Sequence, residues 1–223
     1  MNGLLEGKKI LVMGVANKRS IAWGCAQVMA QQGATLIFTY QNERMKKSLA
    51  KLVNDDDRLI ECDVAADENI EKAFTEVQKR FGKIDGIVHA IAYADRNELQ
   101  GDVMKTTREG YNLAQDISAY SLIAVARYGQ KILNHPGSIV TLTYMGSVRA
   151  IPNYNAMGIA KAALESAVRY LARDMGKDNI RVNAISAGAM KTLAVTGVAD
   201  HSALLAESVR RTVDQHSVTL EEI

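Results

Sequence analysis

Short apolar runs alternate with longer segments of helical period along most of the chain. The apolar runs, rich in aliphatic and β-branched residues, predict strands at Ile10–Gly14, Thr35–Tyr40, Arg58–Cys62, Gly86–Ala90, Ser138–Thr143 and Arg181–Ile185. The segments between them predict helices at Ser20–Gln32, Glu43–Val53, Glu68–Phe81, Arg108–Leu133 and Tyr154–Met175. Such alternation is typical of βαβ units, so the sequence predicts a doubly wound parallel α/β sheet covered by helices on both faces.

The regular alternation ends after Ile185. A loop rich in small residues follows, and Ser202–Arg211 predicts a short helix. Leu220–Ile223 predicts the start of another element, which the end of the sequence interrupts. We therefore expect residues 1–223 to form a single domain that is incomplete at its C-terminal end.

Composition places the chain among ordinary globular proteins. Of its 223 residues, 48% are hydrophobic and 23% are charged, which is enough apolar material for one sizeable core. Lys and Arg number 27 against 25 Asp and Glu, and no long basic run is present, which argues against a nucleic-acid or anionic-membrane partner.

Cysteine usage and hydropathy bear on the compartment. Cys25 and Cys62 have no neighbours at metal-ligand spacing, and a reduced intracellular protein is the default for such a pair. The apolar run that follows Lys8 and Lys9 is too short for a signal peptide, and no stretch reaches the ~18 residues of a membrane span. We expect a cytoplasmic protein.

The stretch from Gly137 to Lys161 holds the candidate chemistry. A strand ends near Thr143 and a helix begins near Tyr154, and function in open α/β sheets lies at such strand ends. Tyr154 and Lys161 are two helical turns apart, about 10 Å along the axis, so their side chains share a face. A phenol beside an ammonium suits proton donation, because the cation lowers the phenol's pKa toward neutral pH. Tyr144 is close enough in sequence to line the same pocket. Alternatively, Tyr154 only packs the helix and Lys161 is a solvated surface residue.

The first strand ends in a candidate nucleotide loop. Gly14 permits a tight turn, Ser20 can cap the next helix, and the free amides at that helix start suit a pyrophosphate. The pattern GxGxxG is absent. Gln41 stands where NAD-binding sheets usually have an acid. The basic residues that follow either bind the 2′-phosphate of a dinucleotide or are solvated charges on a helix: Arg44, Lys46 and Lys47. Asp63, after the third strand, either accepts a hydrogen bond from an adenine amino group or caps the next turn. His89 is interpreted as a packed strand residue.

Four stretches together resemble a known family: MGVANKRSIAWG, TREGYNLAQDISAYSL, TLTYMG with NYNAMGIAKAALE, and RVNAISAGAMKTLA. The chain resembles the enoyl-acyl-carrier-protein reductases of bacterial type II fatty-acid synthesis, a branch of the short-chain dehydrogenase/reductase superfamily. Six residues separate Tyr154 from Lys161, as in the enoyl reductases, whereas ordinary short-chain dehydrogenases place the lysine four residues after the tyrosine. The resemblance implies a three-layer Rossmann-like fold that lacks the family's last strand and helix.

The resemblance also assigns residues. It implies that Tyr154 hydrogen-bonds the thioester carbonyl, that Lys161 holds the nicotinamide ribose and that Tyr144 is a second active-site tyrosine. Positions 187–212 match the family's substrate-side loop and short helix, and no metal is implied. Substrate positions match at Ala94, Tyr144 and Tyr154. Cofactor positions match at Gly14, Ser20, Ile21, Gln41, Asp63, Val64, Ile91, Lys161, Met190, Lys191, Thr192, Leu193 and Ala194.

The implied reaction is hydride transfer from NADH to the β-carbon of a trans-2-enoyl thioester on acyl carrier protein. Tyr154, assisted by Lys161, stabilises the negative charge that develops on the thioester oxygen. The amide of Gln41 resembles NADH-using members, with NADPH left open, and the family implies a homotetramer. The chain departs from the family at Tyr93, where phenylalanine is common, and at Ala189, where proline is usual.

Two rival functions remain from the sequence. The first is a short-chain carbonyl or alcohol dehydrogenase, which the spacing of Tyr154 and Lys161 disfavours. The second is a nucleotide-binding or oligomer-interacting protein without turnover, for which NADH binding without reduction of an enoyl thioester would be the sign.

Overall fold

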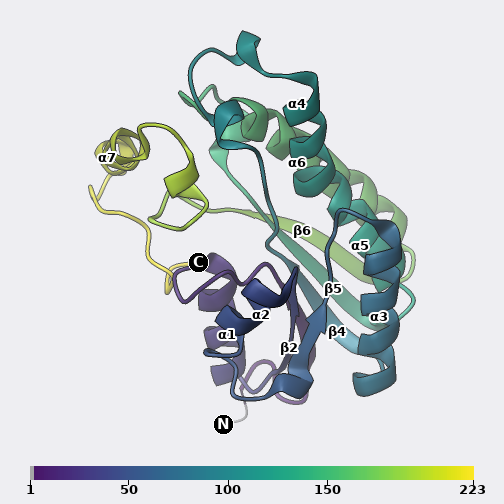
Figure 1. The fold of residues 1–223 in the computed structure, drawn as a ribbon. Coiled ribbons are helices and arrows are strands. Elements are labelled where there is room, and N and C mark those ends of the chain that lie inside the picture. The colour runs from purple at the N-terminus through teal and green to yellow at the C-terminus, as the bar shows by residue number, and fades with distance from the viewer. Residues whose placement is uncertain (1–2) are drawn as a thin grey trace.

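The computed structural model describes residues 3–223 and contains one parallel sheet of six strands in the order β3-β2-β1-β4-β5-β6 (Figure 1). The three-layer α/β prediction is confirmed. The strands are β1 (Lys9–Met13), β2 (Thr35–Tyr40), β3 (Leu59–Glu61), β4 (Ile84–His89), β5 (Leu133–Thr143) and β6 (Ile180–Ser186).

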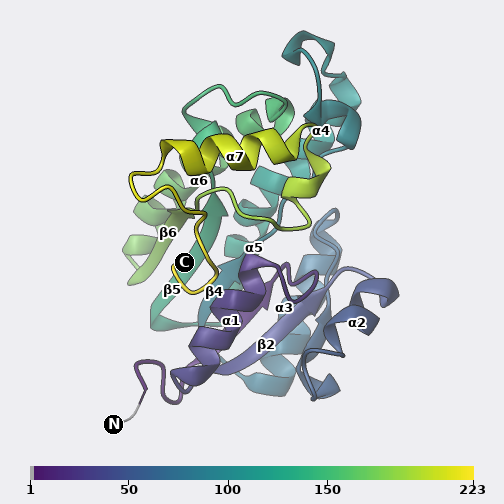
Figure 2. The same cartoon turned by 90° about the vertical axis from the view of Figure 1, so that its left-hand side faces the viewer.

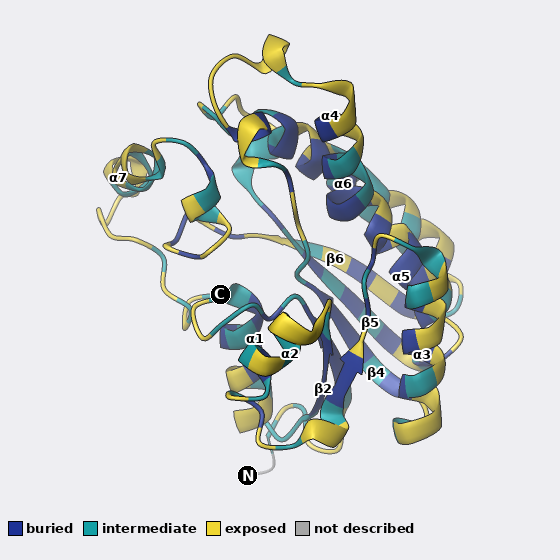
Figure 3. Ribbon diagram, viewed as in Figure 1, coloured by how far each residue is buried: buried dark blue, intermediate teal, exposed yellow. Residues whose placement is uncertain are grey.

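Helices cover both faces of the sheet, with α1 and α2 on one side and α3, α5 and α6 on the other (Figures 1 and 2). Residues of β1 alternate between the two faces: Ile10 and Val12 pack in the core beneath α1 and α2, while Leu11 and Met13 pack in the core beneath α3, α5 and α6. Burial is therefore concentrated on the strands and on the inner faces of the helices (Figure 3). The helices are α1 (Ile21–Gln31), α2 (Glu43–Leu49), α3 (Asp67–Phe81), α4 (Arg108–Gln115), α5 (Ser121–Gly129), α6 (Asn155–Gly176) and α7 (His201–Arg211).

The predicted helix Arg108–Leu133 is wrong in two respects. A π-helical turn, η4 (Asp116–Tyr120), separates α4 from α5. The helical stretch then ends at Gly129, and Leu133 already belongs to β5, paired with Ile84 of β4. Val125, Tyr128 and Ile132 continue the three- and four-residue spacing of the helix up to the start of the strand, so the period alone does not separate helix from strand.

The sheet changes its winding direction between β1 and β4. Gly14 follows β1 with φ +95°, and a Cβ atom there would lie 2.1 Å from the carbonyl oxygen of Ala90, just after β4. Only glycine fits this turn, because it tolerates both the positive φ and the contact. In open α/β sheets, ligands bind at such a switch point, at the carboxyl ends of the strands.

The chain after β6 leaves the sheet, forms α7 and returns toward α1 (Figure 2). Val218 reaches Gly188 and Leu220 reaches Gly24 of α1: Cβ atoms built on these glycines would lie 2.9 Å and 3.0 Å from the two side chains. The element expected from Leu220 is not found, because the described residues after Arg211 form turns and irregular structure. Within residues 3–223, no helix is both long and apolar enough to cross a membrane.

Candidate active site

Tyr144 and Tyr154 lie together at the carboxyl end of β5. Tyr144 directly follows the strand, and Tyr154 directly precedes α6. Their rings meet edge to face, with centroids 5.2 Å apart and planes at 78°. The predicted pairing of the two tyrosines is therefore present in the structure, and it is of a kind that stabilises aromatic pairs.

Two glycines make room for the Tyr154 ring. A Cβ atom on Gly146 would lie 2.5 Å from Cδ1 of Tyr154 and 3.2 Å from Cδ1 of Tyr144. A Cβ atom on Gly158 would lie 2.9 Å from the Gly146 carbonyl oxygen and 3.4 Å from Cδ1 of Tyr154. The sequence analysis did not single out either glycine. Both lie within four residues of a predicted active-site tyrosine, which is a signal that could have identified them.

Lys161 is a buried residue of α6, so the interpretation as a solvated surface lysine is wrong. Its side chain is 7% exposed, and Nζ donates a hydrogen bond of 2.7 Å to the carbonyl oxygen of Leu142 near the end of β5. Burial lowers the pKa of the Lys161 ammonium to about 8, against an opposing effect of Glu165. The ammonium is held beside the end of the strand that carries Tyr144.

Tyr154 does not have the lowered pKa that the sequence predicted. Burial raises the pKa of its phenol well above the usual value, and Tyr144 adds to the effect. The ammonium of Lys161 is directed at the Leu142 carbonyl, so the loss of water around the phenol outweighs the attraction of a cation. Burial also raises the pKa of Tyr144. Both phenols are therefore neutral at pH 7 and can donate hydrogen bonds.

Glu165 links the segment around Tyr144 to α6 and was not predicted as a site residue. Its Oε1 accepts hydrogen bonds from the Thr143 hydroxyl at 2.7 Å and the Ser147 hydroxyl at 2.5 Å. One turn along α6 from Lys161, it raises the pKa of that lysine. The spacing of four residues between lysine and glutamate is a recognisable helical pair and could have indicated this role.

His89 packs inside the sheet, as predicted. Its ring nitrogens lie 3.0 Å from the hydroxyl of Thr141 and 2.9 Å from that of Ser121. Burial, and then the charge of Lys161, lower the pKa of His89 to about 3, so the ring is neutral. It is a structural neighbour of the site.

The loop after β1 differs from the prediction at Ser20. Ser20 is the N-cap residue of α1, yet its hydroxyl makes no cap hydrogen bond and donates instead to the carbonyl oxygen of Asn17. The amides at the start of α1, beginning with Ile21, are thus left without a side-chain cap, and the first turn has no acidic residue. Such a helix start attracts anions.

Gln41 and Asp63 lie together where β2 and β3 end. The Gln41 amide donates a hydrogen bond of 3.4 Å to Oδ1 of Asp63, which also accepts one of 3.1 Å from the Ala65 amide. Asp63 thus caps the turn that follows β3, one of its two predicted roles. Two other predicted cofactor positions belong to the core: Val64 is buried, and Ile91 is partly buried against the same cluster.

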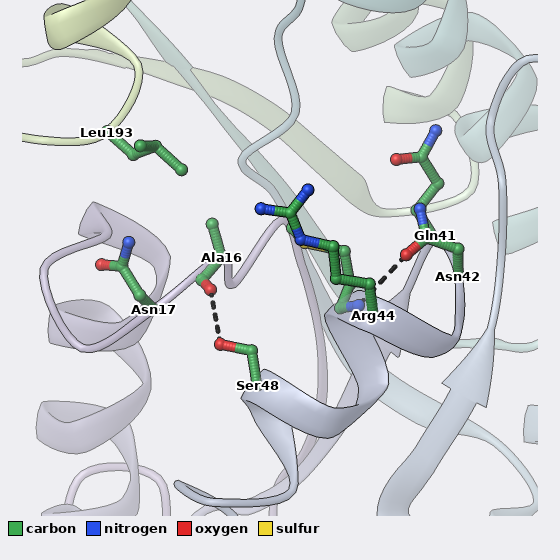
Figure 4. A pocket seen from close by; sticks show the side chains of 8 residues that line it. Ala16, Asn17, Gln41, Asn42, Arg44, Ser48 and Leu193 are labelled. Atoms are coloured by element: carbon green, nitrogen blue, oxygen red, sulfur yellow. Dashed lines mark hydrogen bonds between the residues drawn. The ribbon is translucent and has the colours of Figure 1, made fainter.

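A cavity of about 380 Å³ opens between the ends of β1 and β2 (Figure 4). It is bordered by Gln41 and by Leu193, which comes from the loop after β6, and the guanidinium of Arg44 points into it. The hydroxyl of Ser48 closes one side by donating a hydrogen bond of 3.1 Å to the Ala16 carbonyl. The volume lies within the range of small-molecule sites. The other lining residues are Asn17, Asn42 and Met45.

The predicted loop from Met190 to Ala194 has two buried and three exposed residues. Met190 and Thr192 are buried, and the Thr192 hydroxyl accepts a hydrogen bond of 3.3 Å from the amide of Val195. Lys191, Leu193 and Ala194 face outward, and Leu193 reaches the cavity.

Ala94 lies apart from the cavity, on the side of the two tyrosines. It is buried in an apolar cluster that includes Leu99, Met157 and Val198, and Tyr154 packs against that cluster. The site thus has two ends, one at the cavity and one around Tyr154 and Ala94.

The amino-acid sequence matches a known protein family. Residues 14–223 match the family described as Enoyl-(Acyl carrier protein) reductase. The chain belongs to this family. The prediction made from the spacing of Tyr154 and Lys161 is confirmed at the level of the family.

Curated members of the family resemble the chain over nearly its full length. The enoyl-[acyl-carrier-protein] reductase [NADH] FabI of Enterococcus faecalis is 59% identical, over 98% of this chain and 88% of that protein. The enzyme of Staphylococcus aureus is named as the [NADPH] form and is 48% identical, over 96% of this chain and 87% of that protein.

Solved structures of the family have the same fold. The Bacillus cereus enoyl-acyl carrier protein reductase, with NADP+ and indole naphthyridinone, superposes with a TM-score of 0.95 at 46% identity, over 98% of this chain and 87% of that one. The Anaplasma phagocytophilum reductase in complex with NAD superposes with a TM-score of 0.92 at 39% identity, over 99% of this chain and 85% of that one.

Proposed function

We propose that the protein reduces the trans-2 double bond of an enoyl-acyl-carrier-protein thioester by hydride transfer from NADH. The observation that carries the proposal is the pair of neutral phenols, Tyr144 and Tyr154, at the end of β5, with the buried ammonium of Lys161 beside the same strand. Relatives at 46% to 59% identity are named as NADH-dependent reductases of this kind.

The chain offers a fitting site for the dinucleotide. The cavity beside Gln41 is the size of a small-molecule site, the turn at Gly14 lets a ligand approach the backbone, and the start of α1 suits a pyrophosphate. We assign the adenosine end to the cavity and the nicotinamide end to the region of Lys161 and the loop from Met190 to Ala194. When bound, NADH supplies the hydride.

Tyr154 is the residue that acts on the substrate. Its raised pKa keeps the phenol protonated, so that it can donate a hydrogen bond to the thioester oxygen as negative charge develops there. Tyr144, whose ring meets that of Tyr154, is assigned to the same acyl site, and Ala94 to the apolar cluster against which Tyr154 packs. Lys161 holds a ribose hydroxyl, and its positive charge favours the developing anion. Because burial excludes water, these interactions are stronger than they would be in solvent.

The test is consumption of NADH in the presence of a trans-2-enoyl thioester. We expect turnover by the native chain, and a loss of about 10²- to 10³-fold in kcat for Tyr154→Phe, which deletes only the donor. Tyr170→Phe is the matched control, since Tyr170 lies on α6 and is 67% exposed. Reduction of a simple ketone in place of the enoyl thioester would support the dehydrogenase alternative. Binding of NADH with neither reaction would support a binding protein.

We further propose that residues 1–223 form one reductase domain, with residues 187–212 on the substrate side, and that the enzyme is a cytoplasmic homotetramer. The free thiols of Cys25 and Cys62 suit a reducing compartment. Tyr111, Ile123 and Ile159 leave apolar surface on α4, α5 and α6 that a second subunit could cover. Sedimentation would test the tetramer.

A further inference from the structure

Two asparagines with unusual backbone conformations flank Tyr154. Asn153 has φ +64° and Asn155 has φ +27°, in the region that residues other than glycine seldom occupy. Asparagine enters this region more readily than most residues, but at a cost in backbone free energy. Strain of this kind persists only when surrounding contacts hold it in place.

Those contacts join three segments of the chain. The side-chain oxygen of Asn153 accepts a hydrogen bond of 2.9 Å from the Gly101 amide, and its side-chain nitrogen donates one of 3.2 Å to the Ala199 carbonyl. The nitrogen of Asn155 donates to the carbonyls of Gln100 and Gly101, at 3.3 Å and 3.1 Å.

The two loops held by the asparagines also contact each other. The Ala199 amide donates a hydrogen bond of 3.0 Å to the Leu99 carbonyl. Leu99 and Val198 are buried in the same apolar cluster as Ala94, and Tyr154 packs against that cluster. Asp200, which follows, has φ +53° and starts α7. The residues with positive φ, Asn153, Asn155 and Asp200, therefore lie where the two loops meet the start of α6.

We propose that Asn153 is a positioning residue that fastens the loop at 99–101 and the loop at 195–199 to the residue preceding Tyr154. Through these bonds, the arrangement of the acyl-side loops and the placement of the Tyr154 phenol are coupled. The loops form the acyl end of the site, so the coupling acts more on the enoyl thioester than on NADH. The proposed nicotinamide loop from Met190 to Ala194 is bonded to the loop at 195–199, and NADH binding therefore changes by a smaller factor than turnover. The catalytic part of this inference rests on the proposed reductase function.

Because Asn153 has a positive φ, two substitutions at this position separate the effect of its hydrogen bonds from the effect of its backbone conformation. Asn153→Gly keeps the positive φ without strain and deletes both side-chain hydrogen bonds. Asn153→Asp keeps the acceptor for the Gly101 amide but turns a carboxylate oxygen toward the Ala199 carbonyl, where no hydrogen bond can form. The first variant removes one hydrogen bond from each loop, and the second removes only the bond to the loop at 195–199. The loop at 99–101 keeps its two bonds to Asn155 in both variants.

A second asparagine provides the control. Asn179 has φ +58° and lies at the turn between α6 and β6, away from both loops. Asn179→Gly therefore makes the same chemical change in the same backbone conformation outside the site. Any general effect of replacing a strained asparagine by glycine will appear in both variants.

The experiment measures amide hydrogen exchange, the Kd of NADH, and kcat and KM for a trans-2-enoyl thioester. For Asn153→Gly we expect faster exchange at both 99–101 and 195–199, a kcat about 10- to 100-fold lower, and a Kd for NADH that rises by a much smaller factor than kcat falls. For Asn153→Asp we expect faster exchange at 195–199 only. Asn179→Gly should match the native chain in all of these.

Three results would overturn the inference: unchanged exchange in both loops of Asn153→Gly, kinetics equal to those of Asn179→Gly, or an equal loss of NADH affinity and turnover. The last would indicate general loosening of the fold. If the native chain shows no turnover, the proposed reductase function fails. The exchange measurement then still decides whether Asn153 holds the two loops.

Discussion

The contact between Gly146 and the Tyr154 ring makes a substitution at Gly146 the sharpest test of the site. In Gly146→Ala the new methyl group would lie 2.5 Å from Cδ1 and 2.8 Å from Cε1 of Tyr154. Carbon atoms pack at about 3.5–4.0 Å, so the ring must move by about 1 Å or more. A shift of this size at a catalytic group can cost about 10²-fold in rate. We expect kcat for the enoyl thioester to fall by about that factor.

Two glycines of α6, Gly158 and Gly176, provide internal controls for the test. At Gly176 a Cβ atom would meet nothing within 4 Å, so Gly176→Ala should keep the native rate. At Gly158 it would lie 2.9 Å from the Gly146 carbonyl and 3.4 Å from the Tyr154 ring, so Gly158→Ala should fall between the other two. The assay is NADH consumption, with NADH binding by fluorescence to confirm a folded site. A native kcat for Gly146→Ala would refute the close fit of the ring.

Three further predictions follow from single contacts. Burial lowers the pKa of Lys161 to about 8, so kcat/KM should fall as the pH rises past that value. Glu165→Gln removes the carboxylate that raises this pKa, so in a pH–rate profile the fall in kcat/KM should begin at a lower pH than in the native chain. Arg44→Ala should raise KM for NADPH by about tenfold and change KM for NADH little, because only NADPH has a phosphate to pair with the guanidinium in the cavity. Gly14→Ala should lower the free energy of unfolding in urea by about 3 kcal/mol or more, through strain and overlap together. Gly82→Ala, with φ +72° and open space, should lose less, because it meets the backbone strain without the overlap.

The sequence predicted the parts of the fold that depend on hydrophobic period. The strands are short and continuous apolar runs, and the order of strand and helix follows directly from them. Predicting that Tyr144 and Tyr154 line one pocket needed only their nearness in sequence and the end of a strand before them, and their rings meet in the structure. The start of β5 was missed because Pro136, which cannot donate to the ladder, interrupts the pattern, and the prediction began the strand at Ser138.

Properties that depend on burial were predicted less well. The direction of the Tyr154 pKa shift came out wrong because proximity to a lysine is visible in the sequence, while the exclusion of water is not. The hydroxyl of Ser20 bonds backward to Asn17, and a capping preference does not reveal which of two nearby partners a serine takes. The roles of Gly146 and Gly158 depend on where a ring from another segment lies, which only the folded chain determines.

The π-helical turn at Asp116–Tyr120 makes the fold sensitive to the number of residues between α4 and α5. A π turn accommodates one residue more than an α turn, and each residue of an α-helix advances about 100° around the axis. Deleting one residue there would rotate α5 relative to α4 and turn the buried side chains of Leu122 and Val125 away from the sheet. The same turn places the Ser118 hydroxyl against the backbone of Tyr93, beside Ala94. A deletion in this turn would therefore disturb the packing of α5 and the backbone beside Ala94 at the same time.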